Sequence, residues 1–285
     1  MSERERPGKT SDQKAEDNPK GRVLSIAGSD SGGGAGIQAD IKAISMNGGY
    51  AMTAITAITL QNTQGVFGVV PVSPRAIREQ IRLTLTDIGA DVIKTGMLGD
   101  RATIESVCDA WNEFAPKTAK VIDPVMVATS GDRLLASDAV DVLKQLLVPG
   151  AYLLTPNAPE AEILSNKAVE SVDGQRRAAE RLMEVGAKAV LVKGGHVSGD
   201  VITDVLHTEY DEFFFETRRI ETENTHGTGC TLASAISTYL ALGASLPDAV
   251  ERGRDYLIRA IETAKPLGQG HGPVNHSWPL SKLER

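Results

Sequence analysis

The sequence predicts an α/β protein with a mostly parallel central sheet and helices on both of its faces. Two observations support this. Short runs rich in β-branched residues alternate with longer helical patterns from residue 22 onward, and glycines and polar residues gather where the apolar runs end. Strands that alternate with helices form parallel sheets. No internal repeat and no linker rich in Pro, Ser or Gly divides the chain, so we expect one domain over residues 21–285.

The first half of the chain supplies five strands and four helices in this interpretation. Apolar spacing and a Gly-Gly stop define the first helix, and a Ser-Pro start defines the second. The predicted strands cover residues 22–28, 51–62, 66–73, 91–97 and 119–126. The predicted helices cover residues 36–49, 73–88, 100–114 and 137–148.

The second half continues the alternation and adds a hairpin. Strands are expected at 152–157 and 189–195, and a pair of antiparallel strands at 201–208 and 211–220. Helices are expected at 159–166, 174–186, 227–242 and 247–265. Ligands bind at the carboxyl ends of the strands in open parallel sheets, and the chain's unusual residues fall at those ends.

Composition and termini limit the possible functions. The net charge is -7 among 285 residues and no Lys/Arg cluster occurs, which argues against a nucleic-acid partner. The two cysteines form no CxxC or CxxH spacing, so neither zinc nor a disulfide framework is expected. Residues 1–20 are almost entirely polar and predict a disordered extension without a signal peptide. No run reaches the ~18 apolar residues of a membrane span, and we expect a cytoplasmic protein.

The stretch HGTGC, residues 226–230, precedes a helix of small apolar residues. The first turn of a helix offers unpaired N–H groups and a partial positive charge, and glycines let the backbone close around an anion. The loop is therefore a candidate phosphate cradle, with a tight turn that binds nothing as the alternative. A thiol at this place, Cys230, is expected to have a lowered pKa because helix N-termini favour thiolates.

Two further motifs carry oxygen and nitrogen groups to strand ends. In TPNAPEAEIL, Asn157 and Glu160 are three residues apart and suit Mg²⁺, directly or through water; the alternative is a capping box at a helix start. In VKGGH, Lys193 precedes two glycines and can reach a phosphate, unless it is an ordinary surface lysine. The glycine-rich GSDSGGGAG, residues 28–36, matches no Walker A loop but permits close approach to a small ligand.

The motifs AGSDSGGGAGIQAD, ITLQN, KTGML, DPVM, TPNAPE, VKGGH, HGTGC and GHGPVNH follow one another over residues 22–276. In this order the chain resembles the hydroxymethylpyrimidine/phosphomethylpyrimidine kinases of thiamine biosynthesis, within the ribokinase-like superfamily. The resemblance implies a kinase that uses ATP and Mg²⁺ to phosphorylate a hydroxymethylpyrimidine and then its monophosphate.

The resemblance also assigns residues to roles. It implies a pyrimidine site lined by Gly28, Asp40, Gln61, Met97 and Val125, in which the amide of Gln61 pairs with the ring. It implies Asn157 and Glu160 near Mg²⁺, Lys193 and Thr228 at the nucleotide's phosphates, and an anion hole from Gly227 to Cys230 that includes Gly229. The wider superfamily usually has an aspartate as base where this chain has Cys230, a departure that the pyrimidine kinases share.

Other functions remain open at this stage. Pyridoxal carries a hydroxymethyl group on a nitrogen ring, so pyridoxal kinase activity on the same fold is the main alternative. A non-catalytic pyrimidine sensor would not need the intact kinase motifs, and an α/β hydrolase would need a GxSxG elbow that the chain lacks. We expect a homodimer, because symmetric dimers are common. Residues 127–135, VATSGDRLL, have the composition of a flap that is mobile without ligand.

Overall fold

The computed structural model describes residues 20–128, 130–136 and 138–282. Its centre is one nine-stranded sheet in the order β3-β2-β1-β4-β5-β6-β7-β8-β9. The six strands β1, β2, β4, β5, β6 and β7 run parallel, whereas β3, β8 and β9 pair antiparallel at the two edges. The predicted α/β class with a mostly parallel sheet is therefore confirmed.

The strands lie close to their predicted positions. Their bounds are β1 Arg22–Asp30, β2 Tyr50–Asn62, β3 Gly65–Pro71, β4 Val92–Thr95, β5 Ala119–Ile122, β6 Leu153–Leu154, β7 Ala189–Val192, β8 Val201–Thr208 and β9 Glu212–Arg218. The expected hairpin at residues 201–220 is confirmed as β8 and β9. β6 is much shorter than the predicted 152–157, because Pro156 cannot donate to a ladder.

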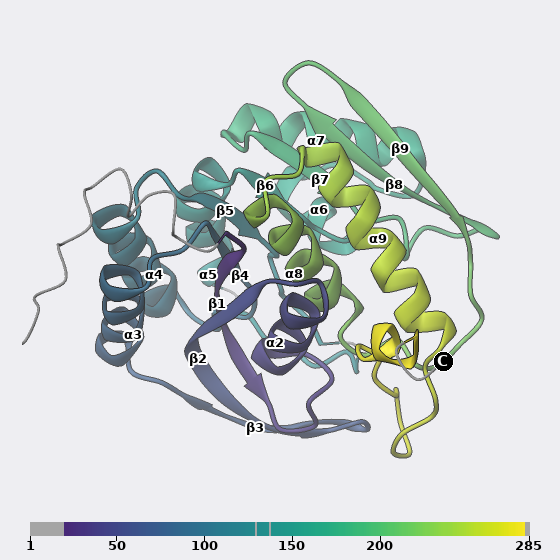
Figure 1. The fold of residues 1–285 in the computed structure, drawn as a ribbon. Helices are drawn as coiled ribbons and strands as arrows, with labels where there is room; N and C mark the ends of the chain where they lie inside the picture. The colour runs from purple at the N-terminus through teal and green to yellow at the C-terminus, as the bar shows by residue number, and fades with distance from the viewer. Residues whose placement is uncertain (1–19, 129, 137, 283–285) are drawn as a thin grey trace, which may run out of the picture.

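Helices cover both faces of the sheet (Figure 1). One face carries α3 Pro74–Asp87, α4 Arg101–Phe114, α5 Ala139–Val142, α6 Ala158–Ser165 and α7 Val172–Val185; the other carries α2 Gly36–Met46, α8 Thr228–Ala241 and α9 Leu246–Glu262. The helix predicted at 137–148 is confirmed in its position, because residues 139–150 are helical without a break, but only α5 at its start is α-helical. After α5 the chain continues as a π-helix, η1 Leu143–Leu147, and a 3₁₀-helix, η2 Val148–Gly150, and Pro149 removes a backbone donor there. A last 3₁₀-turn, η3 Trp278–Lys282, was not predicted.

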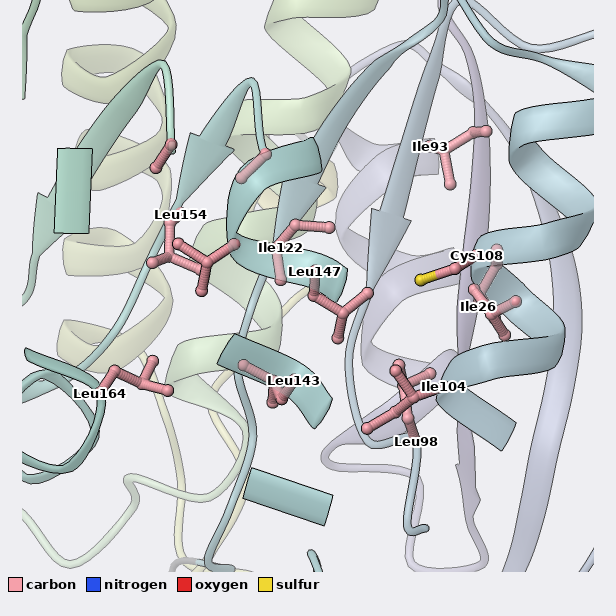
Figure 2. Close-up of a cluster of buried hydrophobic side chains, with 14 of the residues drawn as sticks. Ile26, Ile93, Leu98, Ile104, Cys108, Ile122, Leu143, Leu147, Leu154 and Leu164 are labelled. Atoms are coloured by element: carbon pink, nitrogen blue, oxygen red, sulfur yellow. The ribbon is translucent and has the colours of Figure 1, made fainter. Parts of the chain in front are cut away.

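The core consists of two main apolar layers on either side of the sheet. Alternate strand residues face opposite layers, so Val23 packs beneath α8 while its neighbour Leu24 packs with α3 and α4. Figure 2 shows part of the layer beneath α3 to α7, in which Ile26, Ile104 and Cys108 lie on one side and Leu143 and Leu147 of η1 lie next to them. Cys108 is 5% exposed and is a core residue, as its helical context indicates.

No helix in the described ranges is long and apolar enough to cross a membrane. The disordered extension predicted for residues 1–20 falls, apart from Lys20, outside those ranges. The prediction of a single domain over 21–285 stays a prediction.

Candidate active site

A cavity of about 640 Å³ opens at the carboxyl ends of the parallel strands. All of the predicted site residues except Asp40 line it: Gly28, Gln61, Met97, Val125, Asn157, Glu160, Lys193, Gly227, Thr228, Gly229 and Cys230. The first and last of them in sequence, Gly28 and Cys230, are more than two hundred residues apart. They lie in loops that follow strands, and the parallel topology brings the carboxyl ends of these strands to the same edge of the sheet.

The turn after β1 is organised by Asp30, which is 2% exposed. Its carboxylate accepts the N–H groups of Gly32, Gly34 and Ala35 at 2.7–2.9 Å, and it pairs with His226 Nε2 at 2.9 Å. Burial alone would raise the pKa of Asp30, but these hydrogen bonds outweigh burial and lower it to about 2. One ionised carboxylate therefore joins the glycine-rich turn to the loop that leads into α8. The sequence alone assigned no role to Asp30 or to the side chain of His226.

The start of α8 has the form of an anion site. Gly227 is its N-cap residue, with φ +82°, and no side chain caps the helix. A Cβ at Gly227 would lie 1.8 Å from the carbonyl oxygen of Gly34, so only glycine fits between the two loops. The backbone N–H groups at the start of α8 border the cavity through Thr228, Gly229 and Cys230.

Cys230 is half-buried at this helix start. Burial raises the pKa of its thiol to about 11; Lys94 and the Gly36 N–H act in the opposite direction, while Asp40 and Asp123 add to the rise. The expectation of a lowered thiol pKa is therefore wrong, because the cost of burying a thiolate exceeds the benefit of the helix terminus. Cys230 is a neutral thiol at pH 7.

Lys193 lies opposite the start of α8 in a buried ion pair. Its Nζ is 2.9 Å from Asp123 Oδ1, and Thr155 Oγ1 is 3.2 Å from the same oxygen. A Cβ placed on Gly229 would lie 3.4 Å from Lys193 Nζ. The ammonium group is thus close to the anion site, as its predicted contact with a phosphate requires. Asp123, 3% exposed, begins the DPVM motif, but the sequence alone did not assign it to the site.

Asn157 and Glu160 form the capping box that sequence analysis held as the alternative. Asn157 Oδ1 accepts the Glu160 N–H and Glu160 Oε2 accepts the Asn157 N–H, both at 2.9 Å. The two interpretations are compatible, since both residues also line the cavity. Burial raises the pKa of Glu160 to about 7; Lys193 lowers it and Asp123 raises it further.

This donor set fits Mg²⁺. Two nearly buried carboxylates, Asp123 and Glu160, face one ammonium, Lys193, and the raised pKa of Glu160 means that a further cation would be favourable there. The described residues contain no group of three or more His, Cys, Asp or Glu side chains that would enclose a metal by themselves. Mg²⁺ typically keeps several waters and shares substrate phosphates, so an incomplete protein shell is the expected arrangement.

Asp40 differs from the other predicted residues. It is fully buried and does not line the cavity; its carboxylate pairs with Lys94 Nζ at 2.9 Å. The structure therefore places it beneath the site rather than at its surface. Lys94, also fully buried, begins the KTGML motif, but the sequence alone assigned it no role.

The far end of the cavity was not anticipated. Its apolar lining comes from β8, the segment after β9, and α9: Ile202, Ile220, Leu257, Ile258 and Ile261. Charged residues border the same end: Asp204, Arg218, Arg219 and Arg254. Arg254 Nε pairs with Asp204 at 2.8 Å, and the same carboxylate accepts the Gly194 N–H at 2.7 Å. The cavity thus has a polar end near β1 and β2, an ionic centre, and a far end whose apolar surface is bordered by charged side chains.

The predicted flap is tied to the sheet edge. Val127 and Arg133 form a bridge, and Asp132 accepts the Val66 N–H of β3 at 3.0 Å. Val127 and Leu134 line the cavity. Residue 129 lies outside the described ranges, and the mobility of residues 127–135 stays a prediction.

Comparison with known proteins agrees with this geometry. The family model described as phosphomethylpyrimidine kinase matches residues 30–275. A hydroxymethylpyrimidine/phosphomethylpyrimidine kinase from Bacillus subtilis is 44% identical, with 90% of this chain and 94% of that protein covered. A protein of the same name from Rhizobium meliloti is 47% identical, with 89% and 96% covered. The thiamine biosynthesis bifunctional protein ThiED of Geobacter sulfurreducens is 48% identical, and the chain spans about half of it (52%).

Solved structures give the same picture. A phosphomethylpyrimidine kinase from Clostridium difficile has a TM-score of 0.75 at 40% identity, with 84% of this chain and 98% of that one covered. A Bacillus subtilis pyridoxal kinase in complex with ADP has a TM-score of 0.83 at 35% identity, with 91% and 98% covered. A match over most of the chain, at these identities and with these motifs in one cavity, means that the chain belongs to the phosphomethylpyrimidine kinase family.

Proposed function

We propose that the protein transfers the γ-phosphoryl group of ATP to 4-amino-5-hydroxymethyl-2-methylpyrimidine and then to the resulting monophosphate. The observation that carries this proposal is the shared cavity: a polar end with Gln61 and Met97, an unblocked helix start at Gly227, and Lys193 between them. Relatives that the chain covers nearly in full are named as kinases of both substrates.

The cavity suggests one arrangement of the two substrates. The Gln61 amide has both a donor and an acceptor, which suits an aminopyrimidine edge, and Met97 packs against the ring. The apolar end between Ile220 and Leu257 suits the adenine ring. Structures of related pyridoxal kinases with ADP and with AMP-PCP support the use of ATP.

Each charged residue then has a role in phosphoryl transfer. Lys193 and the N–H groups at the start of α8 stabilise the charge on the transferred group, which is the main requirement of this chemistry. Glu160 and Asn157 would hold Mg²⁺, directly or through water, and the ion would neutralise charge on the phosphates. Asp123 holds Lys193 in place at 2.9 Å.

Pyridoxal is the second candidate substrate. A specific observation favours it: three pyridoxal kinase structures have TM-scores of 0.82–0.84 to this chain, against 0.75 for the phosphomethylpyrimidine kinase. Sequence identity points the other way, at 40% for the latter and 32–35% for the former. The pyrimidine is therefore our first choice.

A product assay tests the choice. Purified protein receives Mg²⁺ and ATP with hydroxymethylpyrimidine, its monophosphate or pyridoxal in separate reactions, and chromatography identifies the products. We expect both pyrimidines to be phosphorylated, with little pyridoxal phosphate. Faster turnover of pyridoxal would assign the second function. Tight pyrimidine binding without any turnover would support a sensor.

We also propose that the protein is a homodimer. The β2–β3 hairpin, at one edge of the sheet, exposes Ile58, Leu60, Phe67, Val69 and Val70. Clustered apolar side chains on an edge hairpin are typical of a protein interface.

A further inference from the structure

Lys94 and Asp40 form an ion pair with no exposed side-chain surface. Lys94 Nζ lies 2.9 and 3.0 Å from the two carboxylate oxygens of Asp40. Ser25 Oγ and Ser234 Oγ donate to the same carboxylate at 2.6 and 2.7 Å. Desolvating two charges is costly, and apolar side chains of similar volume would be at least as stable in a core. The pair therefore calls for an explanation other than packing.

The ion pair lies beneath Cys230. Ser234, which donates to Asp40, follows Cys230 by four residues in α8 and so lies on the same face of the helix, one turn on. A Cβ placed on Gly96 would be 3.1 Å from Lys94 Nζ, so the ammonium group reaches toward the carboxyl end of β4.

Several charged side chains lie around Cys230, which is half-buried. Lys94 lowers the pKa of the thiol, as does the Gly36 N–H, whereas carboxylates raise it. The charged groups that face it from the neighbouring strands and helices are Lys94 on β4, Asp40 on α2, Asp123 after β5 and Lys193 after β7.

We propose that Lys94, held in place by Asp40, is a positioning residue that stabilises negative charge on Cys230 Sγ during transfer to the hydroxymethyl substrate. In that step the hydroxyl proton moves to the thiolate and the hydroxyl oxygen bonds to the γ-phosphorus. The bond from phosphorus to the bridging oxygen breaks, and ADP leaves with the electron pair. The thiol later releases the proton to solvent. Lys94 touches no substrate and acts through Cys230.

This inference rests on the proposed function for the identity of the step, but the charge at Cys230 can be measured without substrate. In a Cys108→Ala background, the rate of iodoacetamide alkylation between pH 7 and 11 reports the thiolate of Cys230. We expect Lys94→Met to slow alkylation at pH 8.5 by about three- to tenfold, the effect of up to about one unit in thiol pKa. Asp40→Asn should speed it by a similar factor.

Controls separate this effect from general loss of structure. Ser234→Ala removes one hydrogen bond to Asp40 and keeps both charges, and Arg22→Met breaks the ion pair with Asp91 at the other end of β1 and β4. Both should leave the alkylation profile within about twofold of the parent. If a single variant does not fold, the Lys94→Met/Asp40→Asn double variant replaces it. It should still slow alkylation, because Lys94 influences the thiol more than Asp40 does.

The outcomes are distinct. Changes of opposite sign for Lys94→Met and Asp40→Asn support the proposal, whether or not the enzyme proves to prefer the pyrimidine. Equal slowing in both variants, or no change in either, would overturn it and leave the pair a structural element. If the parent protein has no kinase activity, the proposed function is refuted, but the alkylation result still stands.

Discussion

The folded protein disfavours the ionised form of Glu160. Burial raises its pKa from 4.5 to about 7, so the folded state binds more protons than the unfolded state between these two values. The free energy of unfolding must therefore fall as pH rises through this window, and the penalty persists above it. We expect Glu160→Gln without Mg²⁺ to melt about 3–6 °C above the parent at pH 8 and at the same temperature near pH 4.5.

The same variant should lose function. Without the carboxylate, kcat with Mg²⁺ and ATP should fall by about 100-fold, the upper range for residues that support a metal site. Glu170→Gln is the matched control, since it removes the same charge from an exposed position. Equal melting temperatures for Glu160→Gln and the parent at pH 8 would mean that burial of the ionised carboxylate does not destabilise the folded protein.

Cys230 leads to a kinetic prediction. The first substrate attacks through a neutral hydroxyl, whereas the monophosphate is already ionised at pH 7, because its second pKa is about 6. With a thiol pKa of about 11, the thiolate fraction rises about tenfold per pH unit below that value. We expect kcat for the first transfer, but not the second, to rise between pH 7 and 9. Cys230→Ser should remove that slope and slow the first transfer more than the second. Equal losses in both transfers would leave Cys230 a packing role.

The sequence identified most of the residues that line the cavity, but it did not predict their protonation or their contacts correctly. Lys193, Asn157 and Glu160 stood out because they follow strands at the end of the sheet where ligands bind in open α/β folds, and because they lie in the motifs of the family that the chain resembles. The thiol pKa of Cys230 was predicted in the wrong direction, because burial by segments distant in the chain cannot be read from a local motif. Lys94 begins the KTGML motif, but its role was missed for the same reason: its partner Asp40 comes from α2, 54 residues earlier in the chain.

At the scale of elements, the start of α8 depends on one glycine. Gly227 has φ +82°, and a Cβ there would lie 1.8 Å from Gly34 O. Gly243 also has a positive φ, +94°, but nothing lies within 4 Å of its added Cβ. We expect Gly243→Ala to cost about 1–2 kcal/mol for the left-handed backbone alone. Gly227→Ala should cost at least about 3 kcal/mol and remove ATP binding. Chemical denaturation and calorimetric titration measure the two quantities, and similar costs would mean that the loops can separate.

The flap gives a second prediction at this scale. Asp132 links it to β3 through the Val66 N–H and also accepts a hydrogen bond from Ser130. Asp132→Ala should release residues 127–135, increase their amide hydrogen exchange and raise KM for the pyrimidine about threefold to tenfold. Asp138→Ala is the control, because its side chain makes no cap hydrogen bond at α5. An unchanged exchange rate without substrate would show that the bond to Val66 does not limit the flap's motion.

The boundaries of elements were predictable where turn chemistry is local. Ser73 caps α3 with Pro74 in the first turn, and a Gly-Gly pair follows α2, so both helices were placed within a few residues. For the segment after α5 the helix was predictable but its type was not. Its apolar spacing predicts a helix, and the chain there is helical, but Pro149 and the packing of Leu143 and Leu147 against the core accompany a π-helix and a 3₁₀-helix in place of a regular α-helix.

At the scale of the whole molecule, the proposed dimer depends on the β2–β3 hairpin. Phe67 on the edge strand β3 is 72% exposed, so replacing it in a monomer would cost little. In a dimer that buries the hairpin, Phe67→Lys would place an unpaired charge in an apolar interface. We expect the parent to have about twice the chain mass of 30.3 kDa by light scattering at micromolar concentration, and Phe67→Lys to shift toward the monomer.

Phe214→Lys provides the comparison, since Phe214 lies on the opposite edge strand, β9, with 49% of its surface exposed. It should leave the mass unchanged. A monomeric parent would refute the dimer, and a shift with Phe214→Lys instead would move the interface to the other edge of the sheet. The hairpin also donates the Val66 N–H to the flap residue Asp132. Dissociation by Phe67→Lys should therefore also raise KM for the pyrimidine, in the same direction as Asp132→Ala, because both changes loosen the edge that anchors the flap.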